Sequence, residues 1–273
     1  MTAIEKNHGT VLITGASSGI GRELAREFAP RSTTLVLAAR RLGRLEQLRA
    51  ELLTRHPQLN IVVLAADLSD EHAIESLLAK ISGQAAAVDV LINNAGFGDT
   101  ALFDRAQWPR TRQILRTNVL AVAQLTSALV PGMVARHRGG VLNIGSGAGL
   151  TVLPSAAAYV GSKHFVNGFS EALRADLAGT GVTVTQVCPG PVASEFDQLA
   201  GSPQGMTGTP RAFRISAAQC AREALDGFER GAARVFPGRA YRLLMRMLPF
   251  FPLWMRRKQA ASLAARLRTG QGS

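Results

Sequence analysis

The 273-residue sequence predicts an α/β fold, a doubly wound, seven-stranded parallel sheet flanked by helices. Two observations carry this prediction. Seven short runs are almost continuously apolar, which is typical of strands buried on both faces of a parallel sheet. The segments between these runs are long enough for helices, and strand–helix alternation with right-handed crossovers gives this architecture.

The predicted elements follow one another without a linker, a repeat or a low-complexity tract. The apolar runs place the strands at Val11–Thr14, Leu35–Ala39, Ile61–Ala65, Val88–Ile92, Val141–Ile144, Val182–Val187 and Ala233–Phe236. Helices are expected at Ile20–Phe28, Leu42–Arg55, Asp70–Ile81, Trp108–Arg136, Ala156–Leu177 and Ala217–Phe228. We therefore expect one Rossmann-type domain over residues 1–238, with residues 195–215 as a loop-rich insertion and 239–273 as a C-terminal extension.

The charge balance is strongly basic and uneven along the chain. There are 31 Lys and Arg against 19 Asp and Glu, a net charge of +12, and no acidic residue follows Glu229. Hydrophobic residues make up 47% of the chain, which excludes a disordered protein. A basic C-terminal part points to an anionic membrane surface or to nucleic acid. Nucleic acid is the weaker alternative, because this part is rich in leucine and methionine and has no zinc-finger or Walker pattern.

Cysteine usage and the N-terminus predict a cytoplasmic protein. Cys188 and Cys220 are too few for a disulfide framework or a zinc site, which favours a reducing compartment. The first residues lack the apolar run of a secretory signal. No stretch reaches about 18 apolar residues, so no membrane-spanning helix is expected. The five histidines share no spacing, and no metal site is predicted.

A glycine-rich turn joins the first predicted strand to the first helix. Its glycines follow a Gly-x-x-x-Gly-x-Gly spacing, and they let the backbone approach a pyrophosphate at the helix N-terminus. The candidate phosphate-binding residues are Gly15, Ser17, Ser18, Gly19, Ile20 and Gly21. The alternative is a tight turn without a ligand, but the position directly after the first strand favours a nucleotide.

Two arginines, Arg40 and Arg41, follow the second predicted strand. An acidic residue here would hold the ribose 2′-hydroxyl of NAD, and this chain has none. A guanidinium fits the 2′-phosphate of NADP by charge and geometry. The pattern therefore predicts NADP(H), preferred over NAD(H), with Arg40 in the leading role and Arg41 assisting. The alternative is that both are solvated charges at the start of the next helix.

Four further motifs follow in order. Asn93-Asn94-Ala95-Gly96 ends the fourth strand, Ser146 stands 13 residues before Tyr159, Tyr159 begins a Tyr-x-x-x-Lys motif ending at Lys163, and Pro189-Gly190-Pro191 follows the sixth strand. Together with the glycine turn, these motifs resemble the classical short-chain dehydrogenase/reductase family over roughly residues 8–236. The resemblance implies that residues 1–238 are a catalytic domain.

The residue types at these positions suit proton transfer to a carbonyl group. Tyr159 and Lys163 are four residues apart, so they share one face of a helix. A neighbouring ammonium favours the phenolate and lowers the pKa of Tyr159, which makes this residue the expected proton donor. The Ser146 hydroxyl could hydrogen-bond the same carbonyl oxygen. Taken singly, a helical tyrosine is more often a packing residue, and Ser146 could be an ordinary loop serine.

The resemblance implies further roles. Lys163 also holds the nicotinamide ribose, Asn118 supports a water-linked proton path, and Asp67 contacts the adenine. The cofactor-binding residues implied in this way are Asp67, Asn94, Ala95, Gly96, Tyr159, Lys163, Pro189, Gly190, Val192 and Ser194. Asp67 could instead cap the following helix. A homodimer or homotetramer is expected.

The sequence thus predicts an NADP(H)-dependent oxidoreductase that interconverts a small-molecule carbonyl compound and a secondary alcohol. The substrate is expected to be apolar. Its predicted neighbours are Phe97, Leu150 and Leu153, with Phe196, Leu199, Met206 and Phe213 in the insertion. The alternative is a non-catalytic protein that binds or senses NADP(H), although such a protein would be expected to lack Tyr159 or Lys163.

The C-terminal extension carries a one-sided basic stripe. Arg239, Arg242 and Arg246 fall within about 60° on a helical wheel of roughly 100° per residue. The apolar residues Tyr241, Leu244, Met245 and Leu248 face elsewhere, and Phe250, Phe251, Leu253, Trp254, Arg256, Arg257 and Lys258 follow. Residues 239–258 could therefore lie on an anionic membrane surface. The alternative is that the apolar face covers a sheet edge or a sister subunit and that the arginines are solvated.

Overall fold

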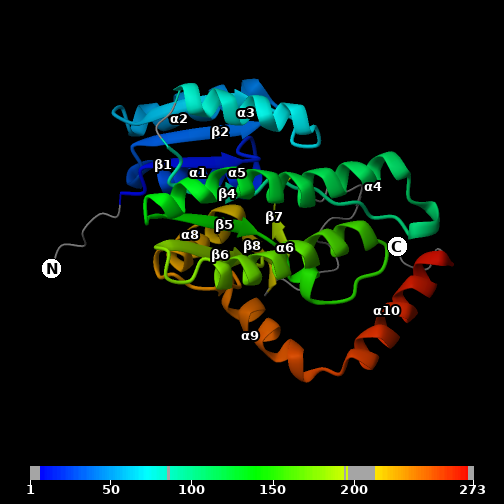
Figure 1. The fold of residues 1–273 in the computed structure, drawn as a ribbon. Coiled ribbons are helices and arrows are strands. Elements are labelled where there is room, and N and C mark those ends of the chain that lie inside the picture. The colour runs from blue at the N-terminus through cyan, green and yellow to red at the C-terminus, as the bar shows by residue number, and fades with distance from the viewer. Residues whose placement is uncertain (1–6, 85–86, 194, 196–212, 270–273) are drawn as a thin grey trace.

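One parallel sheet of seven strands forms the centre of the computed structural model, which describes residues 7–84, 87–193, 195 and 213–269. The strand order is β3-β2-β1-β4-β5-β6-β9, and every neighbouring pair is parallel (Figure 1). The strands are β1 Thr10–Thr14, β2 Thr34–Ala39, β3 Asn60–Ala65, β4 Val90–Asn93, β5 Gly139–Ile144, β6 Val182–Val187 and β9 Arg234–Val235. The predicted sheet is confirmed.

Helices cover both faces of this sheet. Three helices pack on one face: α1 Gly19–Phe28, α2 Leu42–Arg55 and α8 Ala217–Glu229. The other face carries α3 Glu71–Gln84, α5 Ala121–Ala135 and α6 Ala157–Asp176. Along β1, Val11 and Ile13 belong to the first core and Leu12 to the second. The strands are therefore buried on both sides, which explains why they read as continuous apolar runs.

The strand order reverses beside β1, which pairs with β2 on one side and with β4 on the other. The connections after these two neighbours run to opposite faces of the sheet. A crevice opens at such a point, outside the carboxyl ends of the strands. This crevice receives the loops after the strands, which carry most of the predicted site residues.

Two short strands were not predicted. β7 Val192–Ala193 and β8 Ile215–Ser216 pair with each other in a separate parallel ribbon. Two residues are too few to show a hydrophobic period, so these strands could not be predicted from the sequence. The ribbon brings together the two ends of the predicted 195–215 insertion. Residues 196–212 of that insertion lie outside the described residues.

The segment predicted as one helix at Trp108–Arg136 is α4 Trp108–Leu115, a π-helical turn at Arg116–Leu120, and α5. Trp108–Ala135 is long and apolar enough to cross a membrane by length and composition, which the search for apolar runs did not anticipate. Ile114, Leu125 and Met133 in this segment are buried, however, and the last two belong to the core on one face of the sheet.

The C-terminal extension forms a V of two helices, of which the first packs against the body of the molecule (Figure 1). Its arms are α9 Arg239–Met247 and α10 Leu253–Arg268, joined through a 3-10 turn at Leu248–Phe250. Polar contacts hold α10 at both ends. Arg256 donates to the Leu150 carbonyl at 3.3 Å, and Arg268 pairs with Asp104 at 2.8 Å. No described residue of α10 is buried.

Candidate active site

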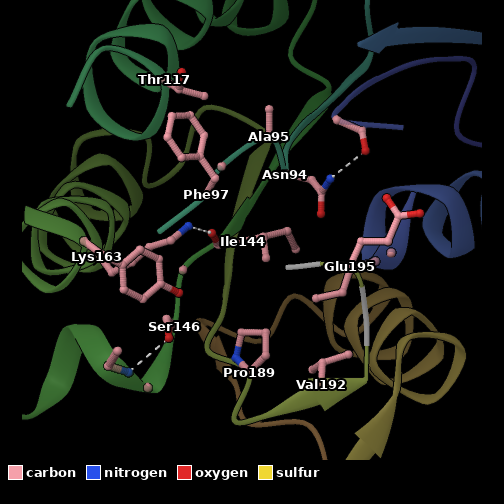
Figure 2. A pocket seen from close by; sticks show the side chains of 18 of the residues that line it. Asn94, Ala95, Phe97, Thr117, Ile144, Ser146, Lys163, Pro189, Val192 and Glu195 are labelled. Carbon is pink, nitrogen blue, oxygen red and sulfur yellow. Dashed lines mark hydrogen bonds between the residues drawn. The ribbon is translucent and has the colours of Figure 1, made fainter. Parts of the chain in front are cut away.

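A cavity of about 720 Å³ occupies the crevice at the carboxyl ends of the strands (Figure 2). It brings together most of the residues that the sequence predicted. Those on its wall are Gly15, Ser17, Ser18, Gly19, Ile20, Arg40, Arg41, Asp67, Asn94, Ala95, Gly96, Ser146, Tyr159, Lys163, Pro189, Gly190 and Val192. Gly21 and Asn118 lie behind the wall, and Ser194 lies outside the described residues.

The glycine turn is shaped by close contacts with the loop after β4. Gly15 has a φ of +66°, and an added Cβ would lie 2.8 Å from Asn94 Nδ2. Asn94 Nδ2 in turn donates to the Thr14 carbonyl at 2.8 Å. A Cβ on Gly21 would lie 2.5 Å from the Gly15 carbonyl oxygen, so Gly21 lets α1 pack against the turn. Glycine is required at both positions because neighbouring atoms lie too close for a Cβ atom.

The N-terminus of α1 opens into the cavity. Ser18 occupies the N-cap position, and its hydroxyl accepts a hydrogen bond from Arg41 at 2.7 Å instead of capping the helix. The helix has no acidic side chain in its first turn. Its free N–H groups and positive dipole end therefore form an anion site beside a guanidinium.

Arg41, rather than Arg40, is anchored at this end of the cavity. Its guanidinium also contacts the Ser17 hydroxyl at 3.1 Å, whereas Arg40 is exposed at the rim. Arg41 Nη1 pairs with Glu195 Oε2 at 2.9 Å. That Arg40 leads and Arg41 assists in binding a 2′-phosphate stays a prediction. Neighbouring positions after a strand do not reveal which side chain turns inward.

Glu195 was not predicted as a site residue. It follows β7 across the cavity from α2, and it pairs with Arg41 and Arg44 together. These two guanidiniums lower the pKa of Glu195 to about 2. The carboxylate of Glu195 thus occupies the cationic end of the cavity, on the far side from Lys163 in Figure 2.

Tyr159, Lys163 and Ser146 lie together at the other end of the cavity. Tyr159 and Lys163 project from α6, and the Lys163 ammonium lies 5.9 Å from the centre of the Tyr159 ring. Lys163 Nζ donates to the Ile144 carbonyl at 2.8 Å (Figure 2). The lysine is only 5% exposed, and this burial lowers its pKa to about 8.

Ser146 follows β5 and opens the 3-10 turn Gly147–Leu150. Its Oγ accepts the Ala148 N–H at 3.0 Å. That bond uses a lone pair and fixes the position of the oxygen, so the hydroxyl hydrogen can be given to a carbonyl oxygen in the cavity. The predicted separation of 13 residues therefore brings Ser146 and Tyr159 to one wall.

Asn118 lies in the π-helical turn and is 1% exposed. Its Oδ1 accepts the Phe97 N–H at 3.2 Å, and its Nδ2 donates to the Phe97 carbonyl and to Ser162 Oγ, both at 3.0 Å. A Cβ on Gly96 would lie 3.0 Å from Asn118 Oδ1 and 3.5 Å from Lys163 Nζ. Asn118 thus holds the loop after β4 beside Lys163. Its role in a water-linked proton path stays a prediction.

Asp67 lines the cavity, and it does not cap α3. Its Oδ1 accepts the Ser69 N–H at 2.9 Å, whereas Asp70 accepts the His72 N–H at the start of the helix. The alternative interpretation of Asp67 as a helix cap is therefore wrong. The carboxylate is held by this turn at the cavity wall beside Leu68.

Helix α9 supplies a wall of the cavity that the sequence did not predict. The apolar residues that line the cavity from this segment are Tyr241, Leu244, Met245 and Leu248. Tyr241 is buried, and its hydroxyl donates to the Pro189 carbonyl at 3.4 Å. The apolar face of α9 therefore covers the crevice, which neither alternative for the extension anticipated.

Two glycines make room for Tyr241. A Cβ on Gly190 would lie 2.7 Å from Tyr241 Cε2, and a Cβ on Gly147 would overlap the Tyr241 hydroxyl and lie 2.9 Å from Cζ. Burial also raises the pKa of Tyr241. The sequence carried a weak signal in the i, i+4 pair of Tyr241 and Met245. The sequence of a helix face does not reveal which surface the face covers. The wall that α9 supplies to the cavity could therefore not be predicted.

Comparison with known proteins agrees with this arrangement. The family model for short chain dehydrogenases matches residues 9–204. An uncharacterized oxidoreductase from Myxococcus xanthus is 41% identical over 192 residues, covering 70% of this chain and 75% of its own. An NADP-dependent 3-hydroxy acid dehydrogenase from Salmonella typhi is 36% identical over 191 residues, covering 69% and 75%.

Among solved structures, a short-chain dehydrogenase from Sphingobium yanoikuyae in complex with NADPH superposes with a TM-score of 0.77. It is 31% identical, and the match covers 84% of this chain and 87% of that one. The fold is therefore shared over most of both chains, and the family match extends over most of the predicted domain. The chain is therefore a classical member of the short-chain dehydrogenase/reductase family of oxidoreductases.

Proposed function

We propose that the protein is an NADP(H)-dependent oxidoreductase that interconverts an apolar carbonyl compound and its secondary alcohol. One observation carries the proposal. Tyr159, Ser146 and Lys163 share a single cavity with an open helix N-terminus and with Arg41. A proton donor, an oxyanion partner and an anion site for a dinucleotide are thereby combined.

The cavity fits NADP(H) on the residues present. The α1 N-terminus and the glycine turn would hold the pyrophosphate, and Arg41 with Arg40 would hold the 2′-phosphate. A relative described as NADP-dependent and a neighbour in complex with NADPH support this choice. When bound, NADPH supplies the hydride. Glu195 already pairs with Arg41, so a 2′-phosphate would compete with this carboxylate.

In the reductive direction, the Tyr159 hydroxyl donates its proton to the substrate oxygen as the carbonyl carbon is reduced. The Ser146 hydroxyl donates a hydrogen bond to the same oxygen and stabilises its developing charge. The Lys163 ammonium favours the phenolate that remains on Tyr159. In the oxidative direction the phenolate accepts the proton again. Asn118, through the loop at Gly96 and Phe97, positions Lys163 for this task.

An apolar substrate is supported by the wall next to Tyr159. Leu153 from the loop after β5 and Leu244, Met245 and Leu248 from the C-terminal extension form this wall. Among the described residues of the cavity wall, the charged side chains other than Lys163 belong to the cofactor end. A substrate with its own charge would be desolvated there without a partner, which is unfavourable.

A substrate panel followed by NADPH absorbance tests the proposal. Ketones and aldehydes of increasing apolar size are compared with charged keto acids, with NADPH and NADH in parallel. We expect NADPH oxidation with apolar carbonyl compounds and slower oxidation of NADH. NADPH binding without turnover across the panel would instead favour the non-catalytic alternative.

A further inference from the structure

We propose that the bend between α9 and α10 docks on an anionic lipid surface. This apolar elbow comprises Met247–Met255, with the sequence MLPFFPLWM, and it carries no charged residue. Phe250 at its tip is 76% exposed, and Trp254 is 66% exposed. Phe251, Leu253 and Met255 are also exposed. A contiguous exposed apolar patch of this kind marks an interaction site.

Cations flank the elbow on both arms. Arg246 precedes it on α9, and Arg256, Arg257 and Lys258 follow it on α10. Arg246, Arg257 and Lys258 are exposed, and among the described residues none of the three lies within ion-pair distance of a carboxylate. No acidic residue follows Glu229 in the sequence. The elbow and its flanks therefore form an apolar tip with a purely cationic collar.

This combination matches the chemistry of a membrane–water interface. Tryptophan and phenylalanine side chains enter the boundary between headgroups and acyl chains, while arginine and lysine contact anionic headgroups. Each such cation near the surface strengthens the attraction to anionic lipid. A second copy of this chain would have to bring carboxylates against the collar. The positive charge of the extension makes an anionic lipid surface the better complement.

The backbone of the elbow suits shallow insertion. Pro249 and Pro252 prevent one continuous helix, and the turns bond internally. The Phe251 N–H donates to the Leu248 carbonyl at 3.1 Å, and the Met255 N–H donates to the Pro252 carbonyl at 3.1 Å. These polar groups are satisfied when the tip leaves water. The elbow is too short to span a bilayer.

The elbow continues the wall of the cavity. Leu248 lines the cavity, and Phe250, two residues later, is at the exposed tip. On the other arm, Arg256 reaches the Leu150 carbonyl, next to Thr151 of the cavity wall. Docking of the tip would bring this side of the cavity to the lipid surface. This inference about the substrate rests on the proposed function: the substrate is then an apolar carbonyl compound dissolved in the membrane.

Trp254 reports on docking directly. The chain has two tryptophans, so the Trp108→Phe variant leaves Trp254 as the single emitter. Vesicles of phosphatidylcholine, with or without phosphatidylglycerol, are added at low and high salt. We expect the Trp254 emission to shift to shorter wavelength, and the protein to co-sediment, with the anionic vesicles at low salt. High salt should release it, because the attraction is screened.

A double substitution, Phe250→Ser with Trp254→Ser, tests the tip. Vesicle affinity should fall roughly tenfold or more, since each side chain loses the transfer of a large apolar surface. Leu263→Ser is the matched control, because Leu263 is exposed on α10 but lies outside the elbow. Turnover of a water-soluble ketone should be unchanged in all variants. This separates the docking proposal from the proposed function.

Three results would overturn the proposal. The first is absence of binding by the intact chain to anionic vesicles. The second is equal binding by the double variant and the wild type. The third is loss of an oligomer in the double variant without any vesicle binding by the wild type, which would show that a second copy covers the elbow.

Discussion

At the residue scale, the burial of Lys163 sets the chemistry of the site. A lysine ammonium with one carbonyl partner and 5% exposure is poorly solvated, and its pKa falls to about 8. The same group must stay charged to favour the phenolate of Tyr159. The protein thus keeps a destabilising charge in its interior, as functional sites often do.

The Lys163 titration predicts how stability depends on pH. An unfolded lysine has a pKa of about 10.4, so between pH 8 and that value the unfolded state binds more protons. The unfolding free energy of the wild type should therefore rise with pH in this window. Lys163→Met should be more stable near pH 7 by up to about 3 kcal/mol.

Denaturant unfolding of both proteins from pH 7 to 10.5 measures this difference. It should shrink as pH rises through the window, because the wild-type lysine becomes neutral. Above pH 8, kcat/KM for carbonyl reduction by the wild type should fall for the same reason. A stability difference that does not change with pH would show that the ammonium is not destabilised by burial.

A second residue-scale prediction concerns Arg41 and Glu195. Arg41→Ala should weaken NADPH binding by about 1.5–3 kcal/mol, the loss of a charge-assisted hydrogen bond, and leave NADH nearly unchanged. Arg40→Ala should have a smaller effect, because Arg40 is exposed. Glu195→Gln should tighten NADPH binding, since it removes the carboxylate that competes for Arg41.

Calorimetric titration of both cofactors decides between these roles. Equal losses of NADPH and NADH affinity in Arg41→Ala would assign the arginine a structural role in holding the glycine turn. Weaker NADPH binding in Glu195→Gln would show that Glu195 supports the arginine rather than competing for it.

At the element scale, α9 is the part of the fold that completes the substrate side of the site. Its apolar face lies on loops that belong to β5 and β6, at Gly147 and Gly190. Arg242 on its outer side pairs with Glu223 of α8 at 2.7 Å, which fixes the helix on the domain. Residues far apart in sequence therefore share one wall of the cavity.

The contact at Gly147 predicts a sharp effect of a small substitution. In Gly147→Ala the new methyl group overlaps Tyr241, so α9 must shift. We expect KM for apolar ketones to rise and the melting temperature to fall, with a cost of about 1–3 kcal/mol for overpacking. Gly168→Ala on α6 is the control, because nothing lies within 4 Å of its added Cβ.

Thermal melts and steady-state kinetics of the two variants test this packing. Gly168→Ala should be neutral or slightly stabilised, since alanine favours a helix over glycine. Gly147→Ala with unchanged KM and melting temperature would mean that α9 does not rest on the site in solution.

At the scale of the whole molecule, local patterns predicted the sheet and its flanking helices but not the helix that covers the crevice. The strands were readable because both faces of each are buried, and the turns because Gly15 and Gly21 face backbone. Tyr159, Lys163 and Ser146 could be assigned because their motif and their spacing resemble those of a known family. Strand ends meet at one edge of a parallel sheet, so their residues converge.

The rest depended on contacts between distant segments. The placement of the Arg41 guanidinium depends on Ser18 and Glu195, which come from two other segments of the chain. Gly147 and Gly190, in two other loops, leave room for the Tyr241 side chain. Neither pairing leaves a periodic trace in the sequence. Homo-oligomerisation and a cytoplasmic location stay predictions.

We expect Tyr159 to give the proton in this cavity, and its replacement by phenylalanine tests this role. Turnover of an apolar ketone by Tyr159→Phe is compared with the wild type, with NADPH affinity measured on the same samples. We expect turnover of the variant to fall roughly 10²- to 10⁴-fold, which is the usual range for removing a general acid. NADPH binding should be retained. Near wild-type turnover in this variant would mean that Tyr159 is not the proton donor.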